Sequence, residues 1–143
     1  MSHENFKKIK ICFVILLSFL LFSCAGTGSK ISPTVSISGS GETNLYFVRE
    51  GGFVAGGVLA KLDVNGKEIA RLGTKEYIKH TVSENFRINV SGAGLGGIGM
   101  GSDSISGIAN SKNYFYIIGV KQGLFSAKFT IQETTDSGYK QAQ

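Results

Sequence analysis

The stretch "LDVNGKEIARL", residues 62–72, contains the clearest structural signal in the chain. Asn65 and Gly66 both tolerate positive φ, which a two-residue type I′ turn requires, and apolar and polar residues alternate on either side. The predicted hairpin pairs Val64 with Lys67, Asp63 with Glu68, and Leu62 with Ile69. This register gives one face an apolar centre and the other a charged pair, as a half-buried hairpin needs.

Further strands are predicted on both sides of this hairpin, each short, rich in aromatic and β-branched residues, and bounded by Gly, Asn or Ser. They are 44–49, 76–82, 86–91, 113–120 and 124–133, and the first strand of the hairpin itself extends over 58–64. The strands 76–82 and 86–91 are expected to form a second hairpin, and the nearly continuous apolar run 113–120 a central strand. No helical period follows the N-terminal segment, so the sequence predicts an all-β fold, a small antiparallel β-sandwich.

The chain begins with a basic patch and an apolar run. Lys7, Lys8 and Lys10 precede Ile11 to Phe22, which is interrupted only by Ser18. Twelve helical residues span about 18 Å, whereas the hydrocarbon core of a bilayer is roughly 30 Å thick. The segment is therefore short for a permanent span and fits the core of a cleaved signal peptide.

The end of this run, Leu21-Phe22-Ser23-Cys24, resembles the lipobox of bacterial lipoproteins, although Phe22 is bulkier than the usual residue there. The resemblance implies cleavage between Ser23 and Cys24 and attachment of a diacylglyceryl group to the Cys24 thiol. Acylation of the new Cys24 amine would add a further chain, and two or three chains hold a protein durably on a membrane. The alternatives are an ordinary secretory signal, in which Cys24 has no role, and a membrane span.

Four segments follow from these assignments: a lipoprotein signal peptide at 1–23, the lipidated Cys and a flexible tether at 24–43, the β-sandwich domain at 44–139, and a tail at 140–143. The tether is assigned because Ser, Thr and Gly dominate it. Within it, "TVSIS" at 34–38 is also compatible with a short edge strand.

Composition argues against several partner classes. The chain has 15 basic and 10 acidic residues, a net charge of +5. Removal of the signal takes three basic residues and one acidic residue, leaving 12 against 9, or +3. No run of Lys or Arg remains, so no nucleic acid partner is expected. Cys12 would leave with the signal and Cys24 would carry lipid, so no disulfide is expected in the domain.

The Gly-rich stretch "SGAGLGGIGMG", residues 91–101, matches the pattern G-x-G-x-x-G of dinucleotide-binding proteins at Gly92–Gly97. A phosphate site of this kind requires a helix immediately after the glycines, because the helix N-terminus binds the anion. The residues that follow are poor helix formers, so no nucleotide partner is predicted. The stretch at 92–101 is instead expected to be a mobile loop or a place where another backbone or a lipid approaches closely.

No catalytic or metal-binding set is found. His80 is the only His after the signal and is expected at the surface, and Asp63, Asp103 and Asp136 are far apart in sequence. We therefore predict no cofactor, no metal and no enzymatic activity, with an envelope hydrolase as the alternative. The strand aromatics are expected in the core rather than in a ligand groove. They are Tyr46, Phe47, Tyr114, Phe115, Tyr116, Phe125 and Phe129.

The order "LYFVRE", "KLDVNGKEIARL", "EYIKHTV" and "NYFYIIGVKQGLFSAKFTIQE" resembles the domain of unknown function 2846 of bacterial lipoproteins, over residues 42–139. The hairpin is also similar to the PEGA-type β-domain. Glu84-Asn85 replaces the Pro-Gly that often precedes the strand at 86–91 in that family. The resemblance implies a small β-sandwich in the cell envelope, and Ala25 after the Cys favours the outer membrane, facing the periplasm.

The expected function is accordingly a lipid-anchored envelope lipoprotein. Its β-domain is expected to act as a binding or structural module, with the membrane and an envelope protein as partners. The alternative is a carrier of a small apolar ligand or lipid in the periplasm, which would need an apolar cavity between the sheets.

Overall fold

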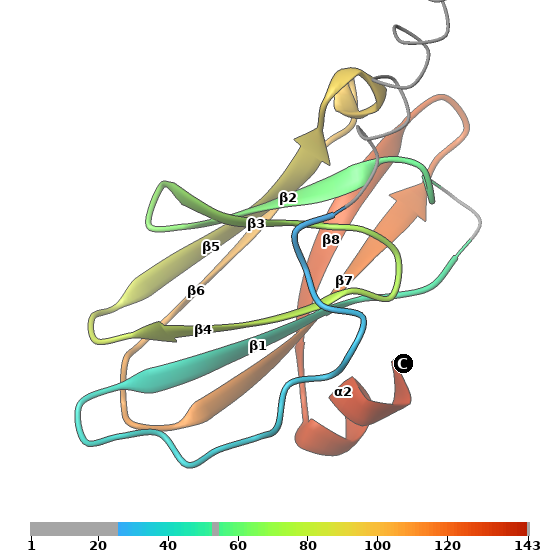
Figure 1. Ribbon diagram of the computed structural model, residues 1–143. Helices are drawn as coiled ribbons and strands as arrows, with labels where there is room; N and C mark the ends of the chain where they lie inside the picture. The colour runs from blue at the N-terminus through green and yellow to red at the C-terminus, as the bar shows by residue number, and fades with distance from the viewer. Residues whose placement is uncertain (1–25, 53–54, 143) are drawn as a thin grey trace, which may run out of the picture.

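The computed structural model describes residues 26–52 and 55–142, which form two four-stranded sheets (Figure 1). The first sheet contains, in spatial order, β4 (Tyr77–Val82), β1 (Thr43–Arg49), β7 (Asn113–Gln122) and β8 (Ala127–Thr134). The second contains β3 (Lys67–Leu72), β2 (Leu59–Val64), β5 (Phe86–Ala93) and β6 (Asp103–Gly107). The predicted β-sandwich is thus confirmed, as is the central position of β7.

Two short helices complete the described fold. The 3₁₀ helix η1 (Leu95–Gly97) follows β5, and the α-helix α2 (Asp136–Gln141) follows β8. Within the residues that the structure describes, neither helix has the length and apolar character needed to cross a bilayer. All strand pairs are antiparallel except β1 and β7, which run parallel because β7 joins β1 after the chain has passed through the second sheet.

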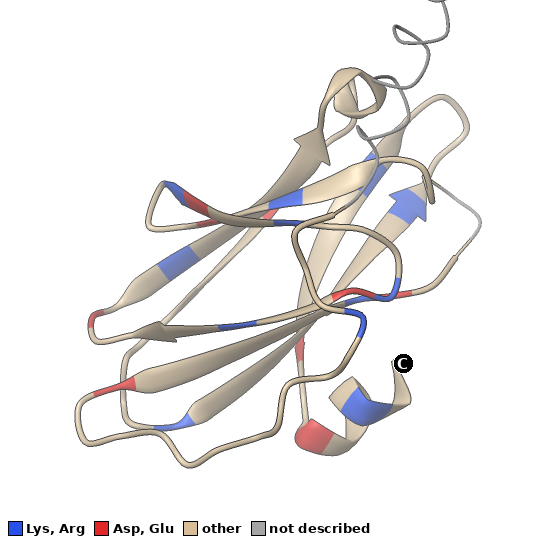
Figure 2. Ribbon diagram, viewed as in Figure 1, with Lys and Arg blue, Asp and Glu red and all other residues tan. Residues whose placement is uncertain are grey.

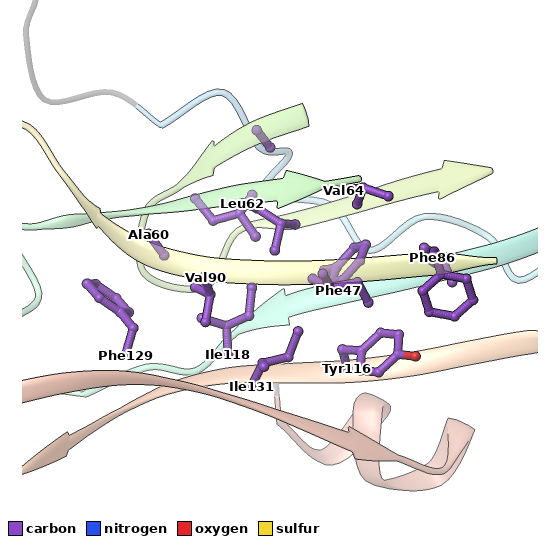
Figure 3. Packing of buried hydrophobic residues seen from close by; sticks show 14 of the residues in the cluster. Phe47, Ala60, Leu62, Val64, Phe86, Val90, Tyr116, Ile118, Phe129 and Ile131 are labelled. Carbon is purple, nitrogen blue, oxygen red and sulfur yellow. The ribbon is translucent and has the colours of Figure 1, made fainter. Parts of the chain in front are cut away.

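The core lies between the two sheets and is filled by large side chains from both. Phe47 of β1 stacks on Tyr116 of β7 with ring centroids 5.4 Å apart. Leu62 of β2 and Ile88 of β5 are fully buried in the same cluster. Figure 3 shows how the side chains of this cluster fill the space between the strands. Burial of this apolar surface is the main driving force for the association of the sheets.

The hairpin around Asn65 and Gly66 is present, and both residues have the positive φ that the turn requires, 50° and 79°. The predicted pairs next to the turn are correct, but the expected pairing of Leu62 with Ile69 is wrong. A β-bulge lies between Leu62 and Asp63, and Leu62 pairs with Ala70. A regular register would direct the side chain of Arg71 into the core; the bulge turns Leu72 inward instead.

The predicted second hairpin, between 76–82 and 86–91, is wrong. β4 pairs with β1 in the first sheet, whereas β5 pairs with β2 and β6 in the second. The connection at 83–85 therefore crosses from one sheet to the other. Asn65 stabilises this corner, because its side chain donates to Asn85 O (3.2 Å) and accepts from the Arg87 N–H (2.8 Å).

The C-terminal region also differs from expectation, because residues 136–141 form a helix and belong to the domain. Thr135 caps α2 by accepting a hydrogen bond from the Gly138 N–H at 3.1 Å. Tyr139 is fully buried against the outer face of the first sheet, in a second apolar cluster. The other buried members of that cluster are Tyr46, Val48, Tyr77 and Phe115. The tail predicted at 140–143 is therefore not separate from the domain over its described part.

We predict that Tyr139→Ala lowers the free energy of unfolding by about 3 kcal/mol, the cost of removing a buried aromatic side chain from a packed site. Urea denaturation followed by circular dichroism measures the change. Phe125→Ala is the matched control, because Phe125 is completely exposed and should change stability by less than about 0.5 kcal/mol. Equal midpoints for the two variants would contradict the packing of α2 on the sheet.

Candidate functional site

The predicted lipidation residue Cys24, and the cleavage site that it forms with Ser23, lie outside the described residues. The described chain begins two residues later, at Gly26. The site can therefore be built from the residues that immediately follow the predicted anchor and from the part of the sandwich that they contact.

The first described residues bind to the edges of both sheets. The Thr27 N–H donates to Arg71 O of β3 at 2.7 Å, and the Arg71 N–H donates to Thr27 Oγ1 at 2.8 Å. Two residues on, Ser29 and Tyr77 exchange backbone hydrogen bonds of 2.9 and 2.8 Å. Since β3 and β4 are edge strands, this segment pairs with backbone groups that would otherwise face solvent.

The rest of the segment expected to be a tether also makes contacts with the domain. The Ser36 N–H donates to Tyr46 Oη at 2.9 Å, and Ser38 Oγ donates to Asn113 Oδ1 at 2.7 Å. The alternative edge strand at 34–38 does not form. The described residues before β1 therefore contact first the edges of β3 and β4 and then the outer face of the first sheet (Figure 1), which differs from the expectation of a free tether.

The start of this segment, at Gly26, packs against the buried carboxylate of Glu76. Glu76 is 6% exposed, and its Oε2 accepts a hydrogen bond from the Gly73 N–H at 2.8 Å. Lys30 Nζ lies 3.3 Å from its other oxygen, Oε1. A Cβ on Gly26 would overlap Glu76 Oε2 and approach Gly73 N to 2.6 Å, so a side chain at position 26 is incompatible with this packing.

A buried arginine organises the same end of the sandwich. The Arg49 guanidinium donates hydrogen bonds to three backbone carbonyls, of Val58, Ala55 (2.8 Å) and Leu72 (2.8 Å), and lies 5.3 Å from the centre of the Phe129 ring. Burial lowers the pKa of Arg49 from its ordinary value. Sequence reasoning missed this residue, because an Arg at the end of a strand gives no sign of being buried. Its contacts indicate a structural role.

The Gly-rich stretch at 92–101 folds back onto the end of β5. A Cβ on Gly92 would lie 2.6 Å from the Cα of Gly97, so the two backbones are in direct contact and need glycine at this point. The expectation of close backbone approach is confirmed. The helical element here is η1, only three residues long, so the geometry lacks the helix that a dinucleotide site requires.

Large apolar side chains are exposed at this end. Leu95 and Ile98, in the Gly-rich stretch, are 88% and 76% exposed. Leu124 and Phe125, in the turn between β7 and β8, are 95% and 100% exposed. The expectation that Phe125 lies on a strand and in the core is wrong, because β8 begins only at Ala127. The other six strand aromatics lie on strands as predicted, and Tyr46, Phe47, Phe115, Tyr116 and Phe129 are buried.

His80 lies at the opposite end, where it lines an open pocket of about 380 Å³ with Asn65, Lys67 and Glu84. It is half-buried rather than fully at the surface. Burial lowers its pKa from the ordinary value near 6.5, and the positive charge of Lys67 lowers it further. Only one His and one Glu line this pocket, among neutral residues and Lys67, and the pocket is open to solvent.

The three aspartates remain apart in the fold, and each takes part in its own ion pair. These are Lys61–Asp63 at 3.3 Å, Lys128–Asp103 at 3.2 Å and Lys140–Asp136 at 2.6 Å. Within residues 26–52 and 55–142, no three His, Cys, Asp or Glu side chains come close enough to hold a metal ion. Chemical function therefore does not follow from these groups, and the candidate site is the end of the sandwich where Gly26 and Thr27 contact β3.

Comparison of the chain with protein-family models, curated proteins and solved structures found no match. The resemblance to the domain of unknown function 2846 therefore stays a prediction from the sequence. The function has to be argued from the residues and their geometry.

We predict that Gly26→Val displaces the first described residues from β3 and β4, because the new side chain overlaps Glu76. Amide hydrogen exchange at Arg71 and Tyr77 should then become faster, since these N–H groups donate to Thr27 and Ser29. Gly57→Ala is the control, because a Cβ there meets no neighbouring atom within 4 Å. Unchanged exchange in Gly26→Val would contradict the edge pairing.

We also predict a contribution of His80 to the pH dependence of stability. Its folded-state pKa lies below the unfolded value of about 6.5, so the unfolded chain binds more protons and stability is lost as pH falls through 6.5 towards the folded pKa. The carboxylates with lowered pKa, Glu68 and Asp103, lose their contribution only at more acidic pH. Denaturant unfolding between pH 7.5 and 5 should show a steeper loss for the native chain than for His80→Gln; parallel profiles would refute this.

Proposed function

We propose that this protein is a lipid-anchored lipoprotein of the bacterial envelope, attached through Cys24 after cleavage behind Ser23. The observation that carries the proposal is the sequence Leu21-Phe22-Ser23-Cys24 directly after a short apolar run with a basic start. The anchor would face the periplasm, in the outer membrane by the resemblance of Ala25 to the residue at that position in outer-membrane lipoproteins. The β-domain acts there as a binding or structural module, without enzymatic activity.

The architecture supports a module better than a carrier. A carrier of an apolar ligand needs a cavity of several hundred Å³ among apolar walls. Here the space between the sheets holds large, fully buried side chains, among them Phe47, Tyr116 and Phe129. The described pockets lie at the rims of the sandwich and are lined in part by charged or Gly residues.

The exposed apolar side chains offer a surface for such a module to use. Exposed apolar residues that gather in one place are typical of interaction surfaces, whereas single exposed ones are common on any domain. The tips formed by residues 94–100 and 123–126 are of this kind, and they lie at the end of the sandwich where the described chain begins.

We predict that Cys24→Ala abolishes lipid attachment, because the thiol that receives the diacylglyceryl group is lost. In cells labelled with a radioactive or clickable fatty acid, the native protein should carry label and partition into the detergent phase of Triton X-114. The Cys24→Ala variant should remain unlabelled and accumulate as precursor.

Cys12→Ala is the matched control, since Cys12 lies inside the predicted signal peptide and should be dispensable for labelling. An unlabelled native protein whose mature form begins at another residue would favour the ordinary secretory signal. Uncleaved native protein that stays in the membrane would favour the membrane span.

A further inference from the structure

The two exposed apolar tips lie at the same end of the sandwich, and the backbone segments that directly follow them are hydrogen-bonded to each other. The Gly101 N–H donates to Ala127 O at 2.9 Å, and the Phe129 N–H donates to Gly101 O at 2.9 Å. The Gly-rich stretch that carries Leu95 and Ile98 therefore ends directly beside the start of β8, next to the turn 123–126. Figure 1 shows η1 and this turn projecting from one end of the two sheets.

Charge is absent from both tips. Residues 94–100 and 122–126 contain no Lys, Arg, Asp or Glu, and Figure 2 shows η1 and the β7–β8 turn free of charged residues. The closest charged side chain along β7 is that of Lys121, which is exposed and stands opposite Lys128 in the ladder. Lys128 is already paired with Asp103, whereas Lys121 is an exposed basic group close to the β7–β8 turn.

The residues that follow the predicted anchor, Gly26 and Thr27, lie at this same end. Gly26 and Thr27 lie on Arg71 of β3, and Arg71 lines a pocket of about 210 Å³ together with Leu59 and residues 93–96 of the Gly-rich stretch. Cys24 is only two residues before Gly26, and two residues span at most about 7 Å. With the proposed lipid on Cys24, the Cα of the lipidated residue would therefore lie within about 7 Å of the Gly26 Cα, at the end of the sandwich that carries Leu95.

We infer that this end of the sandwich rests on the bilayer, with Leu95, Ile98, Leu124 and Phe125 inserted at the boundary between headgroups and acyl chains. The inference rests on the proposed lipid anchor and adds an orientation to it. Transfer of apolar side chains from water to this boundary lowers the free energy, and exposed basic groups beside them are attracted to anionic lipids. Lys121 is placed for that second contact.

The short connection to the proposed anchor favours the bilayer, rather than a protein, as the surface that the apolar tips contact. A long free tether would allow the domain to turn any face to the membrane. Here Thr27 and Ser29 are paired with β3 and β4, so only Ala25 stands between Gly26 and the residue proposed to carry the lipid. A protein partner or a second copy on the tips would need to fit between them and the membrane surface.

The test uses the absence of Trp from the chain, which makes a single introduced Trp a clean reporter. Phe125→Trp and, as control, Ile108→Trp are prepared in the full lipidated protein and reconstituted into vesicles of phosphatidylethanolamine and phosphatidylglycerol. Ile108 is exposed but lies after β6, at the opposite end of the sandwich. Emission is recorded with and without brominated acyl chains, and vesicle flotation is measured on the same samples.

The expected result is flotation of both variants, with emission at shorter wavelength and loss of intensity on brominated lipid for Phe125→Trp only. Flotation of both variants without quenching of Phe125→Trp would overturn the orientation while leaving the lipid anchor in place; a protein on the tips is then the occupant. Equal quenching at both positions would also overturn it. Failure of the protein to float would overturn the anchor and the orientation together.

Discussion

The fold depends on one strand, β1, whose central residues are apolar on both faces of the sheet. Every residue of β1 is buried, and its side chains alternate between two clusters: Leu45 and Phe47 enter the core between the sheets, whereas Tyr46 and Val48 enter the cluster on the outer face. A two-layer sandwich covers only one face of each sheet. The outer face of β1 therefore needs a third layer, which α2 supplies through Tyr139, whose ring packs edge-on or tilted against the aromatic rings there.

The edges of the sheets impose a second requirement, because unpaired strand edges attract other chains. On one side, β3 and β4 are the edge strands, and the residues that begin at Gly26 pair with both. On the other side, β6 and β8 are the edges, and Gly101 joins β8 through two backbone hydrogen bonds. The segment that begins at Gly26 has the composition of a linker, but it covers the edges of β3 and β4. Glycine is needed at position 26 because a side chain there would overlap the buried Glu76.

Much of this architecture follows from the sequence, and the errors have identifiable causes. Alternation and the Asn65-Gly66 turn predicted the strands and the first hairpin, since both are local signals. The corner at 83–85 was mistaken for a hairpin because a three-residue polar connection suits either geometry; the choice depends on β1 needing a partner on its free edge. β6 was missed because "DSISG" is short and polar, and α2 because a helix of six residues shows too little periodicity.

The candidate site was harder to predict, because it depends on which segments meet in space. The sequence indicates Cys24 as an anchor, but nothing in a Ser- and Gly-rich segment reveals that it pairs with β3. With the proposed lipid on Cys24, that pairing would shorten the connection between lipid and domain from a free coil to about two residues. A short, docked connection would restrict rotation of the domain, so the proposed anchor would also specify which end faces the membrane. The opposite end, with the Asn65-Gly66 turn and the pocket around His80, would then point away from the bilayer and would be the surface open to the proposed envelope partner.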